Sequence, residues 1–319
     1  MTIAPPKAKI SVPLSSELRS DAAVVAVLRA LLEVIVANRE GVLAGRDPEH
    51  LHQLRIAVRR SRTVQRQLGA AFPPLELRGF RSEFRWLQQA TGEARDLDVQ
   101  VEDFDDLRAL LPEALRPDLD PLRMILEHWR LAARGATVRT LRSRRTVDLL
   151  TDWEMLLETL VELPIADREQ ATRPIGEFSA QRVRRAYKRL LKLGEGVSAD
   201  TPAPVLHELR KKGKELRYLL ELFAVPLNSA AALEPVIEPL KALQDILGRQ
   251  QDRVVQIAVL RRVADEVATL PDGAQAVLTM GVLTERLAED ARAARSELNE
   301  PLAELGATEQ RHIIKRTQV

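Results

Sequence analysis

The sequence contains no cysteine, which excludes disulfide bonds and thiolate metal sites. Aromatic residues make up only 3%, which gives little support for a strand-rich fold. Proteins that bind single-stranded nucleic acids usually stack the bases on aromatic side chains, so the low aromatic content also argues against that function. The longest apolar run, VVAVLRALLEVIV, is interrupted by Arg29 and Glu33 and is too short to span a bilayer. The N-terminal stretch MTIAPPKAKISVPLSS lacks the apolar core of a secretory signal, and we expect a cytoplasmic protein.

Good helix formers dominate what is present. Leu, Ala, Arg and Glu are the main residues, and the hydrophobic fraction of 45% is enough for a core. Apolar residues recur at helical spacing, and no alternating run bounded by turns indicates a strand, so the sequence predicts an all-α protein. The expected helices cover residues 16–40, 49–69, 77–91, 95–110, 120–145, 148–162, 176–193, 204–224, 233–248, 250–269, 273–290 and 292–305.

The second half of the sequence repeats features of the first. LHQLR (51–55) matches LHELR (206–210), 155 residues later, and WLQQATGEARDLDV (86–99) matches ALQDILGRQQDRVV (242–255). Within these stretches Gly92 and Gly248 fit C-terminal helix caps. The offset is too long for an ordinary solenoid repeat and instead indicates an internal duplication.

The predicted domain therefore has two halves. We expect a single domain over residues 15–305, made of helical bundles 15–163 and 176–305 that are related by a pseudo-twofold axis. An N-terminal arm (1–14) and a C-terminal tail (306–319) flank it.

Positive charge is concentrated in three helical stripes although the net charge is only +2. Each stripe has basic residues spaced 3, 4 and 3 apart, which places them on one face of a helix. The first, His52, Arg55, Arg59, Arg62 and Arg66, is about 21 Å long; the second is His207, Arg210, Lys214 and Arg217, with Lys211 and Tyr218 alongside; the third is Arg182, Arg185, Arg189 and Lys192. Other basic residues expected to face the same space are Arg81, Arg85, Arg142, Arg145 and Lys241. Arg60 lies off the first stripe and is expected to contribute least to binding.

Like charges at this spacing repel, so the stripes require a counter-charge. They could be solvated surface, paired with internal acids such as those clustered in residues 96–106. Three stripes at matched positions in two halves instead favour a polyanion held in a basic central pore or groove. Arginine binds phosphate oxygens through two parallel hydrogen bonds, and lysine adds a mobile charge.

The histidines and aspartates of the repeat have more than one interpretation. His52 and His207 lead two stripes, which favours contact with the ligand over a structural role. Neither has a second metal-ligating residue at i+3 or i+4, so we expect no metal site. Asp96 and Asp252 are expected to cap helices or to orient the arginines, while carboxylate-bound Mg²⁺ or Ca²⁺ remains an alternative. No Gly-rich phosphate loop or catalytic constellation stands out, so we expect no cofactor and no enzyme activity.

These motifs resemble the CHAD family, the conserved histidine α-helical domain. The likeness covers residues 15–305 and rests on four ordered motifs: His52, Arg55, Arg59, Arg60 and Arg62; then Arg85-Trp86-Leu87 leading to Gly92 and Arg95-Asp96-Leu97-Asp98-Val99; then His207, Arg210, Lys211, Lys214, Arg217 and Tyr218; and Leu243-Gln244-Asp245 through Gly248 to Asp252. Glu221, which stands where Arg66 stands in the first half, departs from the pattern. The alternating Glu and Lys strands of the CYTH phosphatase domain, which accompanies many members, are absent from this sequence.

The resemblance implies a two-lobed helical bundle that binds inorganic polyphosphate, in some members at polyphosphate granules. We therefore expect polyphosphate, and with it granule proteins, as partners, and no membrane. A nucleic-acid-binding helical protein is the first alternative, and a polyphosphate-processing enzyme that uses a histidine intermediate is the second.

Overall fold

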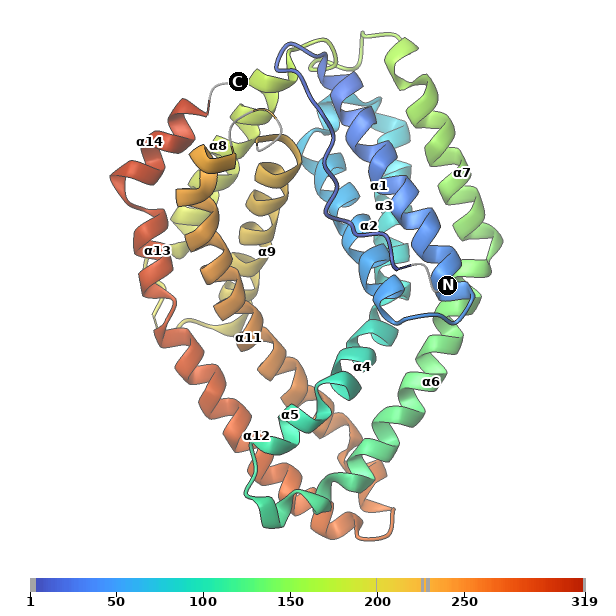
Figure 1. Ribbon diagram of the computed structural model, residues 1–319, viewed down its shortest axis with the longest axis vertical. Helices are drawn as coiled ribbons and strands as arrows, with labels where there is room; N and C mark the ends of the chain where they lie inside the picture. The colour runs from blue at the N-terminus through green and yellow to red at the C-terminus, as the bar shows by residue number, and fades with distance from the viewer. Residues whose placement is uncertain (1–3, 199, 225–226, 228–229, 318–319) are drawn as a thin grey trace.

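The computed structural model describes residues 4–198, 200–224, 227 and 230–317, and helices form nearly all of its regular structure (Figure 1). The α-helices are α1 (Ser20–Leu43), α2 (Glu49–Gln67), α3 (Pro74–Ala90), α4 (Gly92–Glu102), α5 (Phe104–Ala109), α6 (Asp120–Arg142), α7 (Arg144–Thr159), α8 (Ile175–Gly194), α9 (Ala203–Leu219), α11 (Ala230–Ala268), α12 (Gly273–Ser296), α13 (Asn299–Leu305) and α14 (Thr308–Arg316). Short 3₁₀ turns are η1 (Gly69–Ala71), η2 (Glu113–Leu115), η3 (Pro117–Leu119) and η4 (Leu160–Glu162), and α9 continues into a π-helical segment, η5 (Leu220–Ala224). The all-α prediction is confirmed.

Both glycines that were expected to end helices were misread. Gly248 lies inside α11, which runs unbroken for 39 residues where the sequence suggested two helices. Leu243 and Leu247 are buried just before it and Leu260 after it, so the apolar face continues across the glycine, whose cost of about 1 kcal/mol is tolerated. Gly92 is the first residue of α4 and follows Thr91, the actual C-cap of α3.

Both ends of the described chain pack against the helices. Ala8 is fully buried and its backbone N–H donates to Gln53 Oε1 at 2.7 Å, which ties the N-terminal arm to α2. In the expected C-terminal tail, residues 308–316 form α14 and Ile314 is buried in the main core. The sequence prediction missed this helix because it is short and mostly polar.

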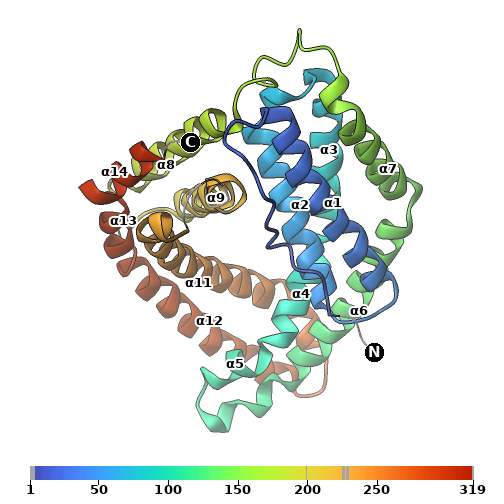
Figure 2. The same cartoon turned by 45° about the horizontal axis from the view of Figure 1, so that its top comes forward.

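Two hydrophobic cores hold the fold together, and each draws residues from both predicted halves. The larger core includes Trp153 of α7, whose ring lies 5.3 Å from that of Phe84, together with Phe178 of α8 and Phe223 of η5. The smaller core combines α4, α5 and α6 with the C-terminal part of α11 and with α12. Figures 1 and 2 show α12 and α6 converging at the end of the molecule opposite α1 and α8. The two halves are therefore interlocked.

The helices of the two halves follow the same packing order. α1 packs on α2 and α8 on α9, while α4 packs on α6 and α11 on α12. α2 and α9 meet near the middle of the molecule, so the two basic helices face each other (Figure 2). This order agrees with the predicted internal duplication, which itself stays a prediction.

A buried ion pair joins α2 to η5, the segment that continues α9. Arg60 is only 4% exposed, and its Nη2 donates to Glu221 Oε2. Arg217 Nε donates to the other oxygen of Glu221 at 2.6 Å, and the Arg60 guanidinium lies 5.2 Å from the centre of the Tyr218 ring. Arg60 thus points away from the basic stripe, as expected, and connects the two halves.

Within the described residues, no helix is both long enough and apolar enough to cross a membrane.

Substituting Glu221 should lower the free energy of unfolding more than substituting its partner Arg60. Glu221→Gln leaves the buried Arg60 without its carboxylate and is expected to lower the free energy of unfolding by about 3 kcal/mol. Arg60→Met should cost less, because Glu221 keeps its hydrogen bond from Arg217. Urea unfolding followed by circular dichroism measures both, with the exposed Glu158→Gln as a control that should change little. Equal losses in the two variants would contradict this account.

Candidate functional site

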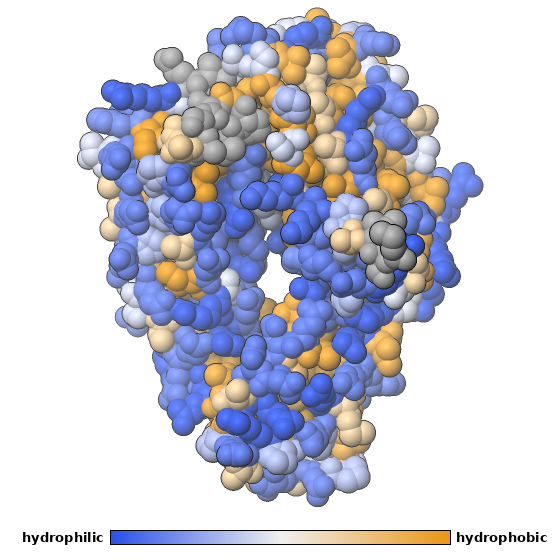
Figure 3. Space-filling view, in the orientation of Figure 1, coloured by the Kyte–Doolittle hydropathy of each residue, from blue (hydrophilic) through white to orange (hydrophobic). Residues whose placement is uncertain are grey.

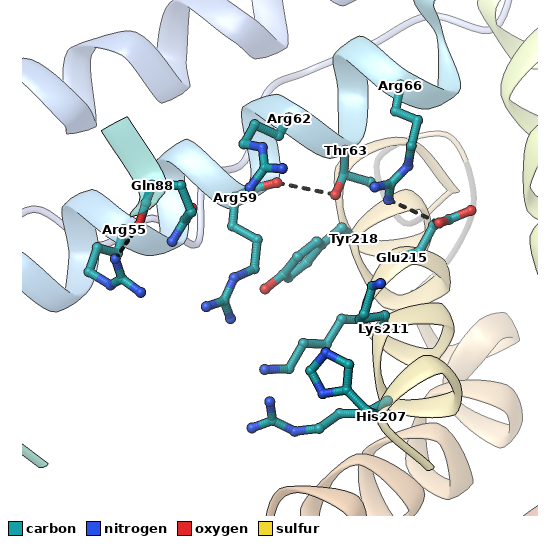
Figure 4. A pocket seen from close by; sticks show the side chains of 12 residues that line it. Arg55, Arg59, Arg62, Thr63, Arg66, Gln88, His207, Lys211, Glu215 and Tyr218 are labelled. Atoms are coloured by element: carbon teal, nitrogen blue, oxygen red, sulfur yellow. Dashed lines mark hydrogen bonds and ion pairs between the residues drawn. The ribbon is translucent and has the colours of Figure 1, made fainter. Parts of the chain in front are cut away.

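A basic cavity of about 310 Å³ lies between α2 and α9 (Figure 4). Seven arginines and lysines line it, together with one histidine and one acid. The lining residues are Arg55, Arg59, Arg62, Thr63 and Arg66 of α2, Gln88 of α3, and His207, Arg210, Lys211, Lys214, Glu215 and Tyr218 of α9. The structure thus brings together most of the first and second predicted stripes.

The amphipathic pattern of each helix explains this placement. On α2, Leu54, Ala57 and Val58 are fully buried in the main core, which turns the arginine stripe toward α9. On α9, Leu209 and Leu216 are buried in the same core, which turns Arg210 and Lys214 toward α2. Residues spaced three or four apart stay on one face, so burial of one face directs the charged face into the cavity.

Arg55 is held against the end of α3. Its Nη1 donates to the backbone oxygen of Gln88 at 2.7 Å and to Thr91 Oγ1 at 3.0 Å. Burial lowers the pKa of Arg55 to about 10, an effect that the nearby Asp96 carboxylate opposes. Positive charge at a helix C-terminus is favourable, so Arg55 is both a wall of the cavity and a structural contact.

Lys214 is the most perturbed cation of the site. Burial, reinforced by the positive charges of Arg59 and Arg210, lowers its pKa to about 7. Asp252 opposes this shift and lies 3.9 Å from the Arg210 guanidinium. About half of the Lys214 side chains are therefore neutral near pH 7, and an anion entering the cavity would favour the charged form.

Asp96 and Asp252 do not cap helices, because they lie within α4 and α11. Each instead faces a cation: Asp96 interacts with Arg55, and Asp252 with Arg210. Burial raises the pKa of both carboxyl groups. The interpretation as partners that orient the arginines agrees with this geometry, whereas the capping interpretation was wrong.

Glu215 is an acid of the site that the sequence reasoning missed. It is buried, and its carboxylate accepts from Arg66 Nη2 at 2.9 Å and from Gln67 Nε2 at 2.6 Å. Figure 4 shows it beside Arg66, where it links α2 to α9. Its position directly after Lys214, within the otherwise basic KKGKELR (211–217), was the available signal.

Two further cavities share residues with the first. One of about 490 Å³ uses Arg210 and Lys214 again and adds Arg217, Arg249 and Arg253, together with the acids Asp103, Asp245 and Asp252. Another of about 330 Å³ uses Arg66 again and adds cationic side chains from α3 and α8, including Arg182. Figure 3 shows an opening in the middle of the molecule with hydrophilic residues around much of its rim. Cationic side chains therefore continue into both adjoining cavities, with acids among them only in the larger one.

Other predicted binding residues lie outside the α2–α9 cavity. Arg185 and Arg189 are exposed on α8, and Lys241 Nζ pairs with Glu238 at 2.6 Å. Arg85 does not line the cavity, but it lies close to Arg62. Burial lowers the pKa of Arg62, and the positive charge of Arg85 lowers it further. The binding role of these residues stays a prediction.

The two histidines have different surroundings. His52 does not line the cavity, and burial together with the positive charge of Arg95 lowers its pKa. His207 lines the cavity, and its Nδ1 shares a hydrogen bond of 3.0 Å with Gln251 Oε1. In the described part of the chain, no group of three or more histidines and acids could hold a metal ion.

Comparison with known proteins identifies the class. The sequence matches the CHAD domain over residues 26–261, and the chain belongs to this family. The crystal structure of the CHAD domain from the plant Ricinus communis is similar over 95% of this chain and 97% of its own, with 28% identity and a TM-score of 0.78.

More distant similarity extends to bacterial proteins. The structure of PptA from Streptomyces chartreusis has a TM-score of 0.64 at 18% identity over 89% of this chain and 99% of its own, which shows a shared fold. The uncharacterized proteins MT2285 and Rv2226, from two strains of Mycobacterium tuberculosis, are each 27% identical over 80% of this chain. The match covers 48% of each, so the chain spans about half the length of these relatives.

The depressed pKa of Lys214 should make stability depend on pH. Between about pH 7 and the ordinary lysine value of 10.5, the unfolded chain binds this proton and the folded chain does not, so stability should rise with pH across that window. Lys214→Met should flatten the rise and should stabilise the protein most at pH 6, where the charged lysine is least favourable. Urea unfolding at pH 6 and pH 9 measures this. Parallel pH profiles for the variant and the wild type would contradict it.

Proposed function

We propose that this protein binds inorganic polyphosphate in the α2–α9 cavity. The supporting observation is that seven arginines and lysines from two helices line one cavity with a single acid, Glu215. That acid is hydrogen-bonded to Arg66 and Gln67. Carboxylates also offset the charge of Arg55, Arg210 and Lys211, so Arg59, Arg62 and Lys214 supply the positive charge most available to a ligand. A ligand with several negative charges would relieve the repulsion that the folded protein otherwise bears.

The arrangement fits a flexible chain of phosphates better than a single anion. Cations follow one another every three or four residues along α2, and the adjoining cavities add more beyond Arg66 and Lys214. Arginine can hold two phosphate oxygens at once, and lysine tolerates varied geometry. Successive phosphates of one chain could therefore occupy successive cations.

A nucleic acid is the second candidate ligand, favoured by the charge alone. Tyr218 is the one aromatic residue lining the cavity, and it is buried and covered by Arg60, so it offers little surface for base stacking. Competition between polyphosphate and RNA at equal phosphate concentration separates the two. Displacement of polyphosphate by RNA would favour the nucleic-acid function.

We propose binding without catalysis, and with it association of the protein with polyphosphate granules and their proteins. The basis is that His207, the histidine in the cavity wall, has cations as its neighbours there and a glutamine as its hydrogen-bond partner. A histidine nucleophile would ordinarily be oriented by a carboxylate or a backbone carbonyl. Sustained phosphate release from polyphosphate with Mg²⁺ would overturn this part of the proposal.

Two arginines that line the cavity should carry much of the affinity. Arg59→Gln with Arg62→Gln is expected to weaken polyphosphate binding about 100-fold, since each charge-assisted hydrogen bond contributes about 1.5 kcal/mol. Arg55 is left unchanged because it stabilises the end of α3. Binding is measured over a salt series, in which the slope of affinity against salt should also decrease.

The matched control is Arg261→Gln with Arg286→Gln, which removes the same charge from exposed positions on α11 and α12, outside the predicted stripes. This variant should keep most of the affinity. Equal losses in the two double variants would show that binding follows net charge and does not use the cavity.

Binding should also be accompanied by proton uptake. Polyphosphate beside Lys214 raises its pKa, so at pH 8 the mostly neutral side chain should take up a proton as the ligand binds. Calorimetry in two buffers with different ionisation enthalpies measures the number of protons. Lys214→Met should remove most of this uptake while leaving measurable binding, and uptake that persists unchanged would contradict the assignment to Lys214.

A further inference from the structure

A second basic groove lies apart from the α2–α9 cavity, between α8 and α14. Its volume is about 470 Å³, and its floor is apolar, formed by Tyr187, Leu191 and Ile314. Two rows of cations border this floor: Arg184, Lys188 and Lys192 on α8, and Arg311 and Lys315 on α14. One acid, Glu195, lies among the lining residues at the end of α8. Among the ion pairs between described residues, none involves these five side chains.

The groove is suited to an acidic amphipathic helix. An apolar floor with charged borders favours an occupant that has apolar side chains along one ridge and carboxylates on both flanks. Cations four residues apart on α8 and α14 lie about 6 Å apart along each helix axis, so carboxylates with the same spacing could pair with them in register.

This chain carries such a helix on its own surface. Met155 lies at the centre of the outward face of α7 and is 53% exposed, with Val147 also exposed nearby. Asp148 and Asp152 lie on one flank of this ridge, and Glu154 and Glu158 on the other, each pair spaced by four residues. Of these four acids, only Asp148 is paired within the described structure, with Arg144 at 2.7 Å.

The two surfaces lie far apart on one molecule. Figures 1 and 2 place α7 and α14 on opposite sides, so α7 cannot reach the groove of its own chain. A contact between two different surfaces is heterologous, and repeated contacts of this kind form open chains unless the rotation between copies closes a ring.

We propose that copies of this protein associate head to tail, with the acidic face of α7 in one copy seated in the α8–α14 groove of the next. The proposal does not depend on polyphosphate binding, because neither surface contributes to the α2–α9 cavity. The charge complementarity weakens with salt, so association should be strong at low ionic strength and weak at about 0.5 M salt.

Two double variants and their mixture test this contact. Lys188→Glu with Lys192→Glu reverses the groove, and Glu154→Lys with Glu158→Lys reverses the helix face. Sedimentation velocity is run at low salt over a concentration series, on protein freed of bound polyanion by high-salt chromatography. The wild type should sediment faster as its concentration rises, and each variant alone should lose at least tenfold in association constant.

An equimolar mixture of the two variants should restore association, because each supplies the surface that the other lacks. Arg261→Glu with Arg286→Glu makes the same change in net charge on exposed positions elsewhere and should associate like the wild type. The neutral variant Lys188→Gln with Lys192→Gln is a control for misfolding caused by charge reversal, and it should also show weaker association than the wild type. A wild type that stays monomeric at low salt, or a mixture that is not restored, would overturn the proposal.

Discussion

Repulsion between closely spaced cations is the constraint on which the rest of this structure depends. Seven arginines and lysines share one cavity, and burial makes their mutual repulsion stronger than it would be in water. The fold balances it with acids placed in the cavity wall or directly beside it. Asp96 lies beside Arg55, Asp252 beside Arg210, and Glu215 beside Arg66. These carboxylates hold the guanidinium groups in position and so reduce the repulsion that opposes folding. They leave an excess of positive charge, so the cavity can still attract an anion.

A carboxylate also offsets cationic charge at the contact between the two halves. Glu221 departs from the basic pattern of the second stripe, because it stands where Arg66 stands in the first. In the structure it receives hydrogen bonds from Arg60 and Arg217, which join α2 to the end of α9. The residue that interrupts the charge pattern therefore keeps the two charged helices together.

The sequence predicted most of the fold because helical periodicity is a local property. The stripes on α2 and α9 were predictable for the same reason, since residue spacing alone places them on one face. What failed depended on tertiary contacts: Gly248 was taken for a helix end, although burial on both sides of it keeps α11 continuous. Glu215 was missed because its importance depends on Arg66, a residue of the other half. Arg185 and Arg189 share a stripe with Arg182, but only Arg182 lines a cavity beside the α2–α9 site.

The interlocked cores determine how rigid the α2–α9 cavity is. Each core contains side chains from both halves, so the halves cannot swing apart without breaking both cores. The cavity between α2 and α9 is therefore a fixed frame and not a clamp that closes on its ligand. An anion that binds there must therefore match a spacing of cations that the fold already sets, with little free energy lost to reordering the protein.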